Sequence, residues 1–290
     1  MTAHPRLEDW PSAAPRLATA AADDRDWYRM LARELVRPTD RLAADIGCGG
    51  AGMTLAMAAT MVCGRIIAVD DEPAVLAEAQ RAVREGWSDP RIDITVTGAD
   101  IAMGTEQLRA CLAGAADLIW ASAVIHHLPD QQAAVTGLAD LLARGGRLAL
   151  AEGGLPSRHL PWDLGCGEPG IELRLLLAQD RWFAAMRAAI PGTTAMPYGW
   201  TEALKRAGLQ PVTTATTLVE HRVPLDGQGR SRILTSLTDR VRRVADAGLL
   251  DEADTAVWRR LLDEKDDQFL GRRADLTSVE ARSVHVGVRP

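Results

Sequence analysis

The chain has 290 residues, of which 47% are hydrophobic, and a formal net charge of −6. These values are typical of an ordinary globular protein with one large domain and appendages, or with two small domains. The four cysteines, Cys48, Cys63, Cys111 and Cys166, are widely spaced, which argues against a disulfide framework and against a zinc site. We therefore expect a reducing, cytoplasmic location.

The charge distribution argues against a nucleic-acid partner. Residues 41–152 hold 8 Lys and Arg against 14 Asp and Glu, whereas residues 153–290 hold 19 against 18. A nucleic-acid-binding protein usually shows a basic face, which this balance does not supply. The sequence also lacks the long uninterrupted apolar run of a membrane span, and Glu8 and Asp9 interrupt the region where a signal peptide would be apolar. Neither a membrane association nor export is expected.

The first part of the chain alternates between two kinds of hydrophobic pattern. Residues 1–22 are rich in Ala and Pro and predict a loosely ordered arm, and a helix is predicted over 23–37, ended by Pro38. Strand-like and helical runs then alternate, with strands over 42–46, 65–69, 92–96, 117–121 and 147–151 and helices over 52–62, 73–86, 105–112 and 130–142. This alternation predicts an α/β fold with a doubly wound parallel sheet, because each crossover helix returns the chain to the same sheet edge.

The regularity ends after Glu152. Residues 153–199 combine Gly and Pro clusters with a helix over 172–189, and a further helix is predicted over 200–207. Strand patterns over 211–223 and 278–288 enclose two amphipathic helices between about 226 and 272. We divide the chain into an N-terminal arm and cap helix (1–40), a core (41–152), a cap insertion (153–199) and the end of the sheet with its helical insertion (200–290).

The most informative motif lies where the first predicted strand meets its helix. Gly47, Gly49 and Gly52 follow Asp45 there, and such glycines let backbone N–H groups approach a ligand at a helix N-terminus. The spacing also satisfies the dinucleotide fingerprint, with Asp70 about twenty residues later for a ribose hydroxyl. Asp45 favours a different ligand, because a carboxylate is a poor neighbour for a pyrophosphate and a good one for an ammonium group.

With this acid, the motif resembles the first motif of the class I methyltransferases that use S-adenosylmethionine (SAM). The resemblance covers about residues 41–152, and it implies a Rossmann-like, seven-stranded sheet whose last strand is antiparallel, with helical cap insertions. One departure is Ala51, where many members carry a glycine. The resemblance implies SAM as the cofactor and assigns it the residues Asp45, Gly47, Cys48, Gly49, Gly52, Asp70, Asp71, Asp100, Ile101 and Ser122.

Two histidines follow the fourth predicted strand. His126 and His127 lie at the carboxyl edge of the sheet, where doubly wound folds bind their ligands. We predict that His127 is buried and bonded to backbone, and that His126 is the general base if the acceptor arrives protonated. A carboxylate or free amine acceptor would need no base.

The acceptor itself is the least defined part of the prediction. A small molecule, such as a specialised metabolite, is preferred, and the acceptor contacts are sought among His159, Trp162, Arg174, Tyr198 and His221. A peptide or protein acceptor, an NAD-dependent oxidoreductase and a non-catalytic SAM-binding protein are the alternatives. The helical pair in 226–272 is expected to pack against the 153–199 insertion and the N-terminal helix and to close the acceptor pocket, or else to form a homodimer face.

Overall fold

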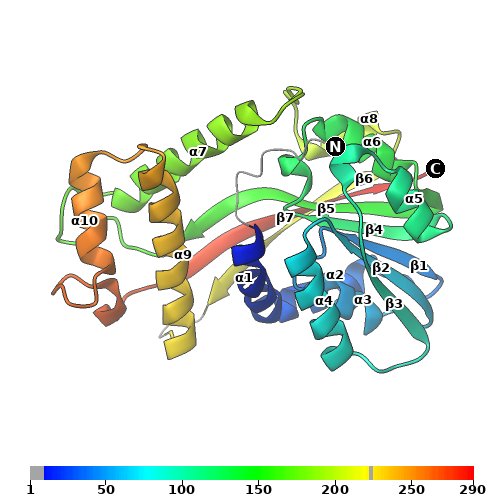
Figure 1. The fold of residues 1–290 in the computed structure, drawn as a ribbon, viewed down its shortest axis with the longest axis horizontal. Coiled ribbons are helices and arrows are strands. Elements are labelled where there is room, and N and C mark those ends of the chain that lie inside the picture. Colours follow the sequence, from blue (N-terminus) through cyan, green and yellow to red (C-terminus); the bar gives the residue numbers. More distant parts are fainter. Residues whose placement is uncertain (1–9, 222–224) are drawn as a thin grey trace. The chain divides into compact units, whose positions relative to one another are not determined.

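The computed structural model describes residues 10–221 and 225–290, and within them seven strands form one mixed sheet (Figure 1). The strands are β1 (Leu42–Ile46), β2 (Gly64–Asp70), β3 (Ile92–Gly98), β4 (Ala116–Ser122), β5 (Leu142–Arg158), β6 (Val212–His221) and β7 (Ser278–Val288). Their order is β3-β2-β1-β4-β5-β7-β6, and the first five are parallel.

The last strand runs against its neighbours. Gly145 N–H donates to the Arg289 carbonyl and Arg289 N–H donates to the Gly146 carbonyl, so bonds run in both directions between Arg289 and two consecutive residues opposite it, as at a bulge between antiparallel strands. The ends of β6 and β7 are joined in the same way, by bonds between the Val288 backbone and the backbone of Gln210 and Pro211. The predicted sheet, with its antiparallel last strand, is therefore confirmed.

Helices connect and cover these strands. They are α1 (Trp10–Asp23), α2 (Arg25–Leu35), α3 (Gly52–Ala58), α4 (Pro73–Gly86), α5 (Glu106–Leu112), α6 (Gln131–Ala139), α7 (Ile171–Ala189), α8 (Trp200–Arg206), α9 (Gly227–Asp246) and α10 (Glu252–Leu262), with short 3-10 turns η1 (Ile101–Met103), η2 (Ile125–His127) and η3 (Leu270–Arg272).

The chain divides into two compact units, and the division falls within β5, β6 and β7. Unit 1 comprises residues up to 153 together with 190–215 and 283–290. Unit 2 comprises residues 154–189 and 216–282. Each unit has its own apolar core.

In unit 1, alternate residues of each parallel strand face opposite sides of the sheet. One side packs Ile46, Ile119 and Leu150 against α5, α6 and α8. On the other side, the ring of Trp120 in β4 lies 6.0 Å from that of Trp27 in α2, in an edge-on arrangement. Trp27 is therefore a packing residue of the sheet's second face.

In unit 2, helices α7, α9 and α10 share one core. Its members include Leu175 of α7, Ile233 and Leu237 of α9, and Trp258 and Leu261 of α10. The helical pair therefore packs on α7 of the 153–199 insertion, as expected. The expected packing against the N-terminal helix, the function of the pair as a cap and the segment boundaries expected from the sequence stay predictions.

Two sequence expectations were wrong. The arm expected over 1–22 is helical from Trp10, because its alanines have the highest intrinsic helix propensity. The fifth strand is longer than the predicted 147–151, because Gly153 and Gly154 lie inside β5 rather than ending it. Gly154 has φ +109°, and a Cβ there would meet the Ala281 carbonyl oxygen at 2.1 Å, so glycine lets β7 approach.

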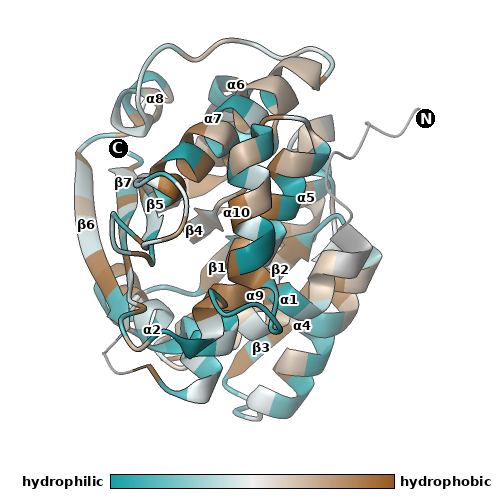
Figure 2. Ribbon diagram, turned by 90° about the vertical axis from the view of Figure 1, so that its left-hand side faces the viewer, coloured by the Kyte–Doolittle hydropathy of each residue, from teal (hydrophilic) through white to brown (hydrophobic). Residues whose placement is uncertain are grey.

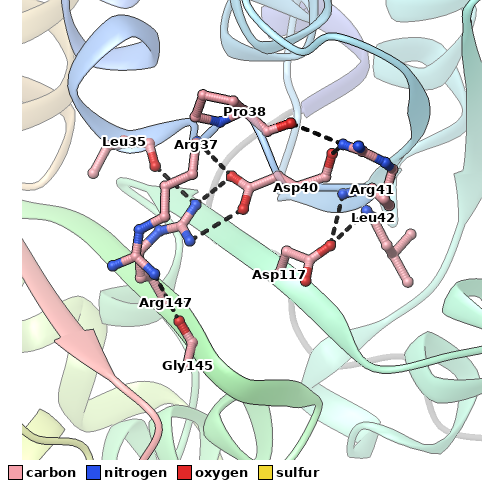
Figure 3. A network of polar contacts seen from close by, with 9 residues as sticks. All are labelled: Leu35, Arg37, Pro38, Asp40, Arg41, Leu42, Asp117, Gly145 and Arg147. Carbon is pink, nitrogen blue, oxygen red and sulfur yellow. Dashed lines mark hydrogen bonds and ion pairs between the residues drawn. The ribbon is translucent and has the colours of Figure 1, made fainter.

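A buried ion pair fixes the start of β1 relative to β5. Figure 3 shows the Arg147 guanidinium bonded to the carboxylate of Asp40 and to the Leu35 carbonyl, the latter at 2.8 Å. The Asp117 carboxylate in β4 accepts from the backbone N–H groups of Arg41 and Leu42 at 2.7 and 3.0 Å. These contacts hold the amino ends of β1, β4 and β5 in register, and the loops at the opposite ends form the site described next.

Candidate active site

The strand order places a ligand site at the carboxyl ends of β1 and β4. These two strands are neighbours, and the chain proceeds from β1 to β2 on one side and from β4 to β5 on the other. Such a reversal separates the loops that follow the two strands and leaves a crevice between them. The predicted motif residues lie at this edge.

The loop after β1 is built on left-handed backbone. Gly47 and Gly49 have φ values of +66° and +50°, and Cys48 N–H donates to the Val69 carbonyl of β2 at 2.9 Å. A Cβ at Gly47 would meet the Val124 side chain at 2.1 Å, so this glycine also permits contact with the loop after β4. A Cβ at Gly49 would meet no atom of the described residues within 4 Å, which leaves open space for a ligand beside it.

The next glycines serve the N-terminal helices. A Cβ at Gly50 would lie 2.7 Å from the Ala18 Cα of α1, and a Cβ at Gly52 would lie 2.6 Å from the Tyr28 ring of α2. Gly52 is therefore needed for helix packing, and its predicted contact with the cofactor stays a prediction. Helices α1 and α2 press directly on the glycine loop.

Ala51 explains why a glycine is common at this position. Its backbone has φ +61° and ψ +25°, the left-handed conformation that costs an L-residue about 1–2 kcal/mol. The Ala51 methyl group is fully buried beside Cys48 and Ala68, which offsets that cost by roughly 1 kcal/mol. The loop therefore keeps the glycine-like path without the glycine.

Asp45 is buried at the end of β1, with 2% of its surface exposed. Its Oδ2 accepts from the Thr54 hydroxyl of α3 at 2.6 Å. Burial raises the pKa of Asp45 to about 6, against the opposing effect of the Thr54 bonds. Burial likewise raises the pKa of the Cys48 thiol, so Cys48 is a small core residue that stays protonated. The contact of Asp45 with an ammonium group stays a prediction.

Asp70 at the end of β2 organises the loops on either side of it. Its Oδ2 accepts from Gly49 N–H at 3.2 Å, and its Oδ1 accepts from the N–H groups of Asp71 and Glu72. Burial raises the pKa of Asp70, while these backbone bonds oppose the shift. A carboxylate has about four acceptor positions, so Oδ2 keeps one for a ribose hydroxyl.

The other predicted cofactor residues occupy neighbouring strand ends. Asp100 follows β3 and accepts from Ala102 N–H at 2.8 Å, which caps the turn that contains Ile101. Ser122 ends β4, and Asp71 is exposed beside Asp70. The fold thus brings these residues to one edge, and their contacts with a cofactor stay predictions.

The loop after β4 carries the histidine pair and is held by an acid that the sequence reading missed. Glu152 of β5 is 3% exposed, and its Oε1 accepts from Val124 and Ile125 N–H at 2.9 and 2.8 Å. Its Oε2 lies 2.7 Å from His126 Nδ1. The same carboxylate therefore fixes the loop backbone and the orientation of the His126 ring.

The signal for Glu152 in the sequence was an acid directly after an apolar run. In the sheet, β5 is the neighbour of β4, and Ser122, the last residue of β4, pairs with Ala151. Glu152 lies inside β5, one residue beyond this last pair, and therefore faces the loop after β4. The Glu152 carbonyl in turn lies 3.1 Å from His285 Nε2 of β7, and His285 Nδ1 lies 2.9 Å from the Thr214 hydroxyl.

The predicted burial of His127 was wrong. Both imidazoles are partly exposed, with ring centres 4.1 Å apart, because the loop forms a 3-10 turn at the sheet edge rather than entering the core. The backbone of His127 does bond locally, through its N–H to the Val124 carbonyl at 3.0 Å. Of the two rings, that of His126 is oriented by the Glu152 carboxylate beside its Nδ1.

The candidate acceptor residues are already engaged in other contacts. In unit 1, the Tyr198 hydroxyl donates to Gln132 at 3.1 Å and its ring lies under the guanidinium of Arg206. In unit 2, Arg174 forms a two-point ion pair with Asp254 at 2.6 and 2.8 Å. Their roles toward an acceptor stay predictions.

The other candidates differ in exposure. His159 of unit 2 is 4% exposed and bonds through Nδ1 to the Thr277 carbonyl at 3.2 Å, and burial lowers its pKa. Trp162 of unit 2 is 65% exposed. His221 ends β6, and its side chain lies outside the described residues, so its predicted acceptor contact is not described here.

A doubly wound sheet with a glycine loop after β1, acids after β2 and β3 and a polar loop after β4 is the arrangement of the class I SAM-dependent methyltransferases. Residues 44–150 match the family described as methyltransferase domain. The chain therefore carries a class I SAM-dependent methyltransferase domain, and SAM is the cofactor of that class. We therefore do not retain the alternative of an NAD-dependent oxidoreductase.

Two relatives align with a longer part of the chain than the family match does. The chain is 33% identical over 186 residues to a trans-aconitate 2-methyltransferase of Methylobacterium radiotolerans, covering 58% of this chain and 63% of that protein. It is 30% identical over 140 residues to a trans-aconitate 2-methyltransferase of Variovorax paradoxus, covering 43% and 49%. The match thus spans less than two thirds of each relative's length.

A solved structure agrees with the fold. A candidate methyltransferase from Bacillus halodurans superposes with a TM-score of 0.50 at 14% identity, covering 92% of this chain and 99% of that one.

In the part of the chain that the structure describes, no helix is long and apolar enough to cross a membrane.

The residues present fit SAM. The open space beside Gly49 admits a ligand next to the loop, and the remaining acceptor position on Asp70 suits a ribose hydroxyl. The buried carboxylate of Asp45 lies beneath the same loop, where it adds negative charge for a cationic ligand. Gly49, Asp70 and Asp45 are the residues that would hold the cofactor.

Proposed function

We propose that this protein transfers a methyl group from SAM to a carboxylate oxygen of a small organic acid, giving a methyl ester. The methyltransferase domain and the trans-aconitate 2-methyltransferases among its relatives support this choice. The observation that carries it is the Glu152–His126 pair beside the glycine loop. A specialised metabolite remains the broader class in which this acid would fall.

A carboxylate acceptor fits a site without an obligatory base. SAM, when bound, supplies a methyl group that is activated by a positively charged sulfur. A carboxylate oxygen is already unprotonated at neutral pH, so accepting a methyl group releases no proton. The work left to the protein is alignment of the acceptor and exclusion of water.

His126 is placed to perform the alignment. Glu152 Oε2 lies 2.7 Å from His126 Nδ1 and fixes the orientation of the imidazole ring. A proton on Nε2 can then donate a hydrogen bond to the acceptor oxygen that does not react. In this role His126 is a donor, whereas the sequence predicted a base.

The experiment is a panel of acceptors incubated with methyl-labelled SAM. Tricarboxylates such as trans-aconitate, dicarboxylates, phenols, amines and a peptide pool are compared, and each product is treated with mild alkali. Methyl esters release labelled methanol under alkali, whereas methyl ethers and methylamines do not. Stable label on a phenol, an amine or the peptide pool, with none on the acids, would overturn the proposal.

A further inference from the structure

His285 connects strand β7 to the acid that holds the loop after β4. Strand β7 lies between β5 and β6 in the sheet (Figure 2). From β7, the His285 ring places Nε2 at 3.1 Å from the Glu152 carbonyl of β5 and Nδ1 at 2.9 Å from the Thr214 hydroxyl of β6. All three residues belong to unit 1, as do the loop residues that Glu152 holds. Both ring nitrogens of His285 are therefore engaged within that unit.

The two contacts define where the proton on the His285 ring lies. Burial lowers the pKa of His285, so the ring is neutral at neutral pH and carries one N–H group. A backbone carbonyl can only accept, so Nε2 carries the proton and donates to the Glu152 carbonyl. Nδ1 then accepts from the Thr214 hydroxyl. The ring is thereby held from both sides in one tautomer and one orientation.

Glu152 lies where β5 departs from regular strand geometry and where its own position matters most. The next residue, Gly153, has φ +74°, outside the range of extended chain. The Glu152 carboxylate accepts from Val124 and Ile125 N–H at 2.9 and 2.8 Å and lies 2.7 Å from His126 Nδ1. A shift of the Glu152 backbone would disturb all three contacts together, because they share one carboxylate.

We propose that His285 is a positioning residue of the methyl-transfer site, which holds the Glu152 backbone where the carboxylate can orient His126. This role rests on the proposed function of the Glu152–His126 pair in methyl transfer. Strand β5 lies between β7 and β4, so His285 acts on the loop after β4 through Glu152. It needs no contact with the acceptor or with SAM.

Two substitutions of His285 separate its hydrogen bond from the bulk of its ring. His285→Gln places an N–H donor as many bonds from the backbone as Nε2, so it can still donate to the Glu152 carbonyl. His285→Phe keeps a ring and removes the donor. We expect His285→Phe to lower kcat roughly threefold to tenfold, the effect of one neutral hydrogen bond, and His285→Gln to recover most of that loss.

Val284→Ala is the matched control for damage to the strand. Val284 is a buried neighbour of His285 in β7, and its side chain lies on the opposite face of the sheet. Its truncation leaves a small cavity and should lower the melting temperature without the loss in kcat. A loss of kcat in Val284→Ala as large as that in His285→Phe would mean that strand stability alone is measured.

The first test is a double-mutant cycle, with the acid of the acceptor panel that yields a methyl ester as the substrate. If His285 acts through His126, His285→Phe should slow the wild type but not a protein that already carries His126→Asn. The affinity for SAM, measured by calorimetry, should be the same in wild type and His285→Phe. Losses that multiply in the double variant, or a His285→Gln variant no faster than His285→Phe, would overturn the proposal.

The second test needs no acceptor, so it is independent of the choice of a carboxylic acid. Nitrogen magnetic resonance of isotope-labelled histidine should show His285 protonated at Nε2 alone, and Glu152→Gln identifies the His126 Nδ1 signal by shifting it. His285→Phe should also shift that signal, whereas His285→Gln and Val284→Ala should leave it in place. An unchanged His126 signal in His285→Phe contradicts the positioning role. An acceptor panel without a methyl ester, with the shift present, contradicts only the proposed function.

Discussion

Replacing Glu152 by Gln separates its chemical role from its structural one. Glutamine keeps an oxygen for the N–H groups of Val124 and Ile125, but it presents an NH₂ group to His126 Nδ1 in place of a carboxylate. The loop therefore keeps its backbone bonds. The imidazole loses its negative partner and is driven to the tautomer that accepts at Nδ1.

The magnitude follows from the charge that is lost. A hydrogen bond to a charged group contributes about 1.5 to 3 kcal/mol and a neutral one about 0.5 to 1.5 kcal/mol, and the difference of about 1 to 1.5 kcal/mol corresponds to a loss of roughly fivefold to tenfold in kcat/KM. Stability should change little in Glu152→Gln. Glu152→Ala is the matched control, because it leaves both backbone N–H groups without an acceptor at about 1 to 3 kcal/mol each.

The assay combines methyl transfer with thermal denaturation. We expect Glu152→Gln to keep the melting temperature and to lose kcat/KM. Glu152→Ala should lose both melting temperature and activity. The reasoning fails if Glu152→Gln has wild-type activity, or if it melts as early as Glu152→Ala.

Three further outcomes are expected. Burial raises the pKa of Asp45 from 3.8 to about 6, so protonated Asp45 contributes stability below pH 4 that is lost as pH rises through 6. The difference between the free energies of unfolding at pH 4 and pH 7 should therefore be smaller in Asp45→Asn than in the wild type. Asp70→Ala should weaken SAM binding by about 1.5 to 3 kcal/mol in calorimetry, with NAD as the negative control; tighter binding of NAD than of SAM would contradict the cofactor assignment. Gly47→Ala collides with Val124 and should lower the melting temperature strongly, whereas Gly49→Ala should stay folded at a cost of about 1 kcal/mol and lose SAM affinity.

The sheet was predictable because its signals are local. Buried parallel strands give short apolar runs, and the glycine motif after the first of them identifies the ligand edge. The acid at Asp70 follows the same logic, since each strand end contributes to one edge. The meeting of the candidate cofactor residues at one edge therefore follows from strand order.

The missed features depend on contacts between distant segments. Glu152 gains its role from Val124 and His126 in the loop after the neighbouring strand β4, and no spacing within the chain reveals that contact. The pair Gly153–Gly154 resembles the end of a strand, yet both residues are part of β5, where β7 approaches Gly154 closely. The helix at residues 10–23 was obscured by Pro11 and Pro15, although its alanines favour a helix and Ala13 and Ala14 are buried.

The contact of α1 and α2 with Gly50 and Gly52 couples two regions that the sequence separates. A ligand that orders the glycine loop also orders the surface on which Ala18 and Tyr28 rest. Cofactor affinity and the local unfolding of the N-terminal helices are then linked equilibria, so each must shift the other by the same free energy. Amide hydrogens of residues 13–35 should exchange more slowly when the cofactor is present, although none of those amides needs to touch it.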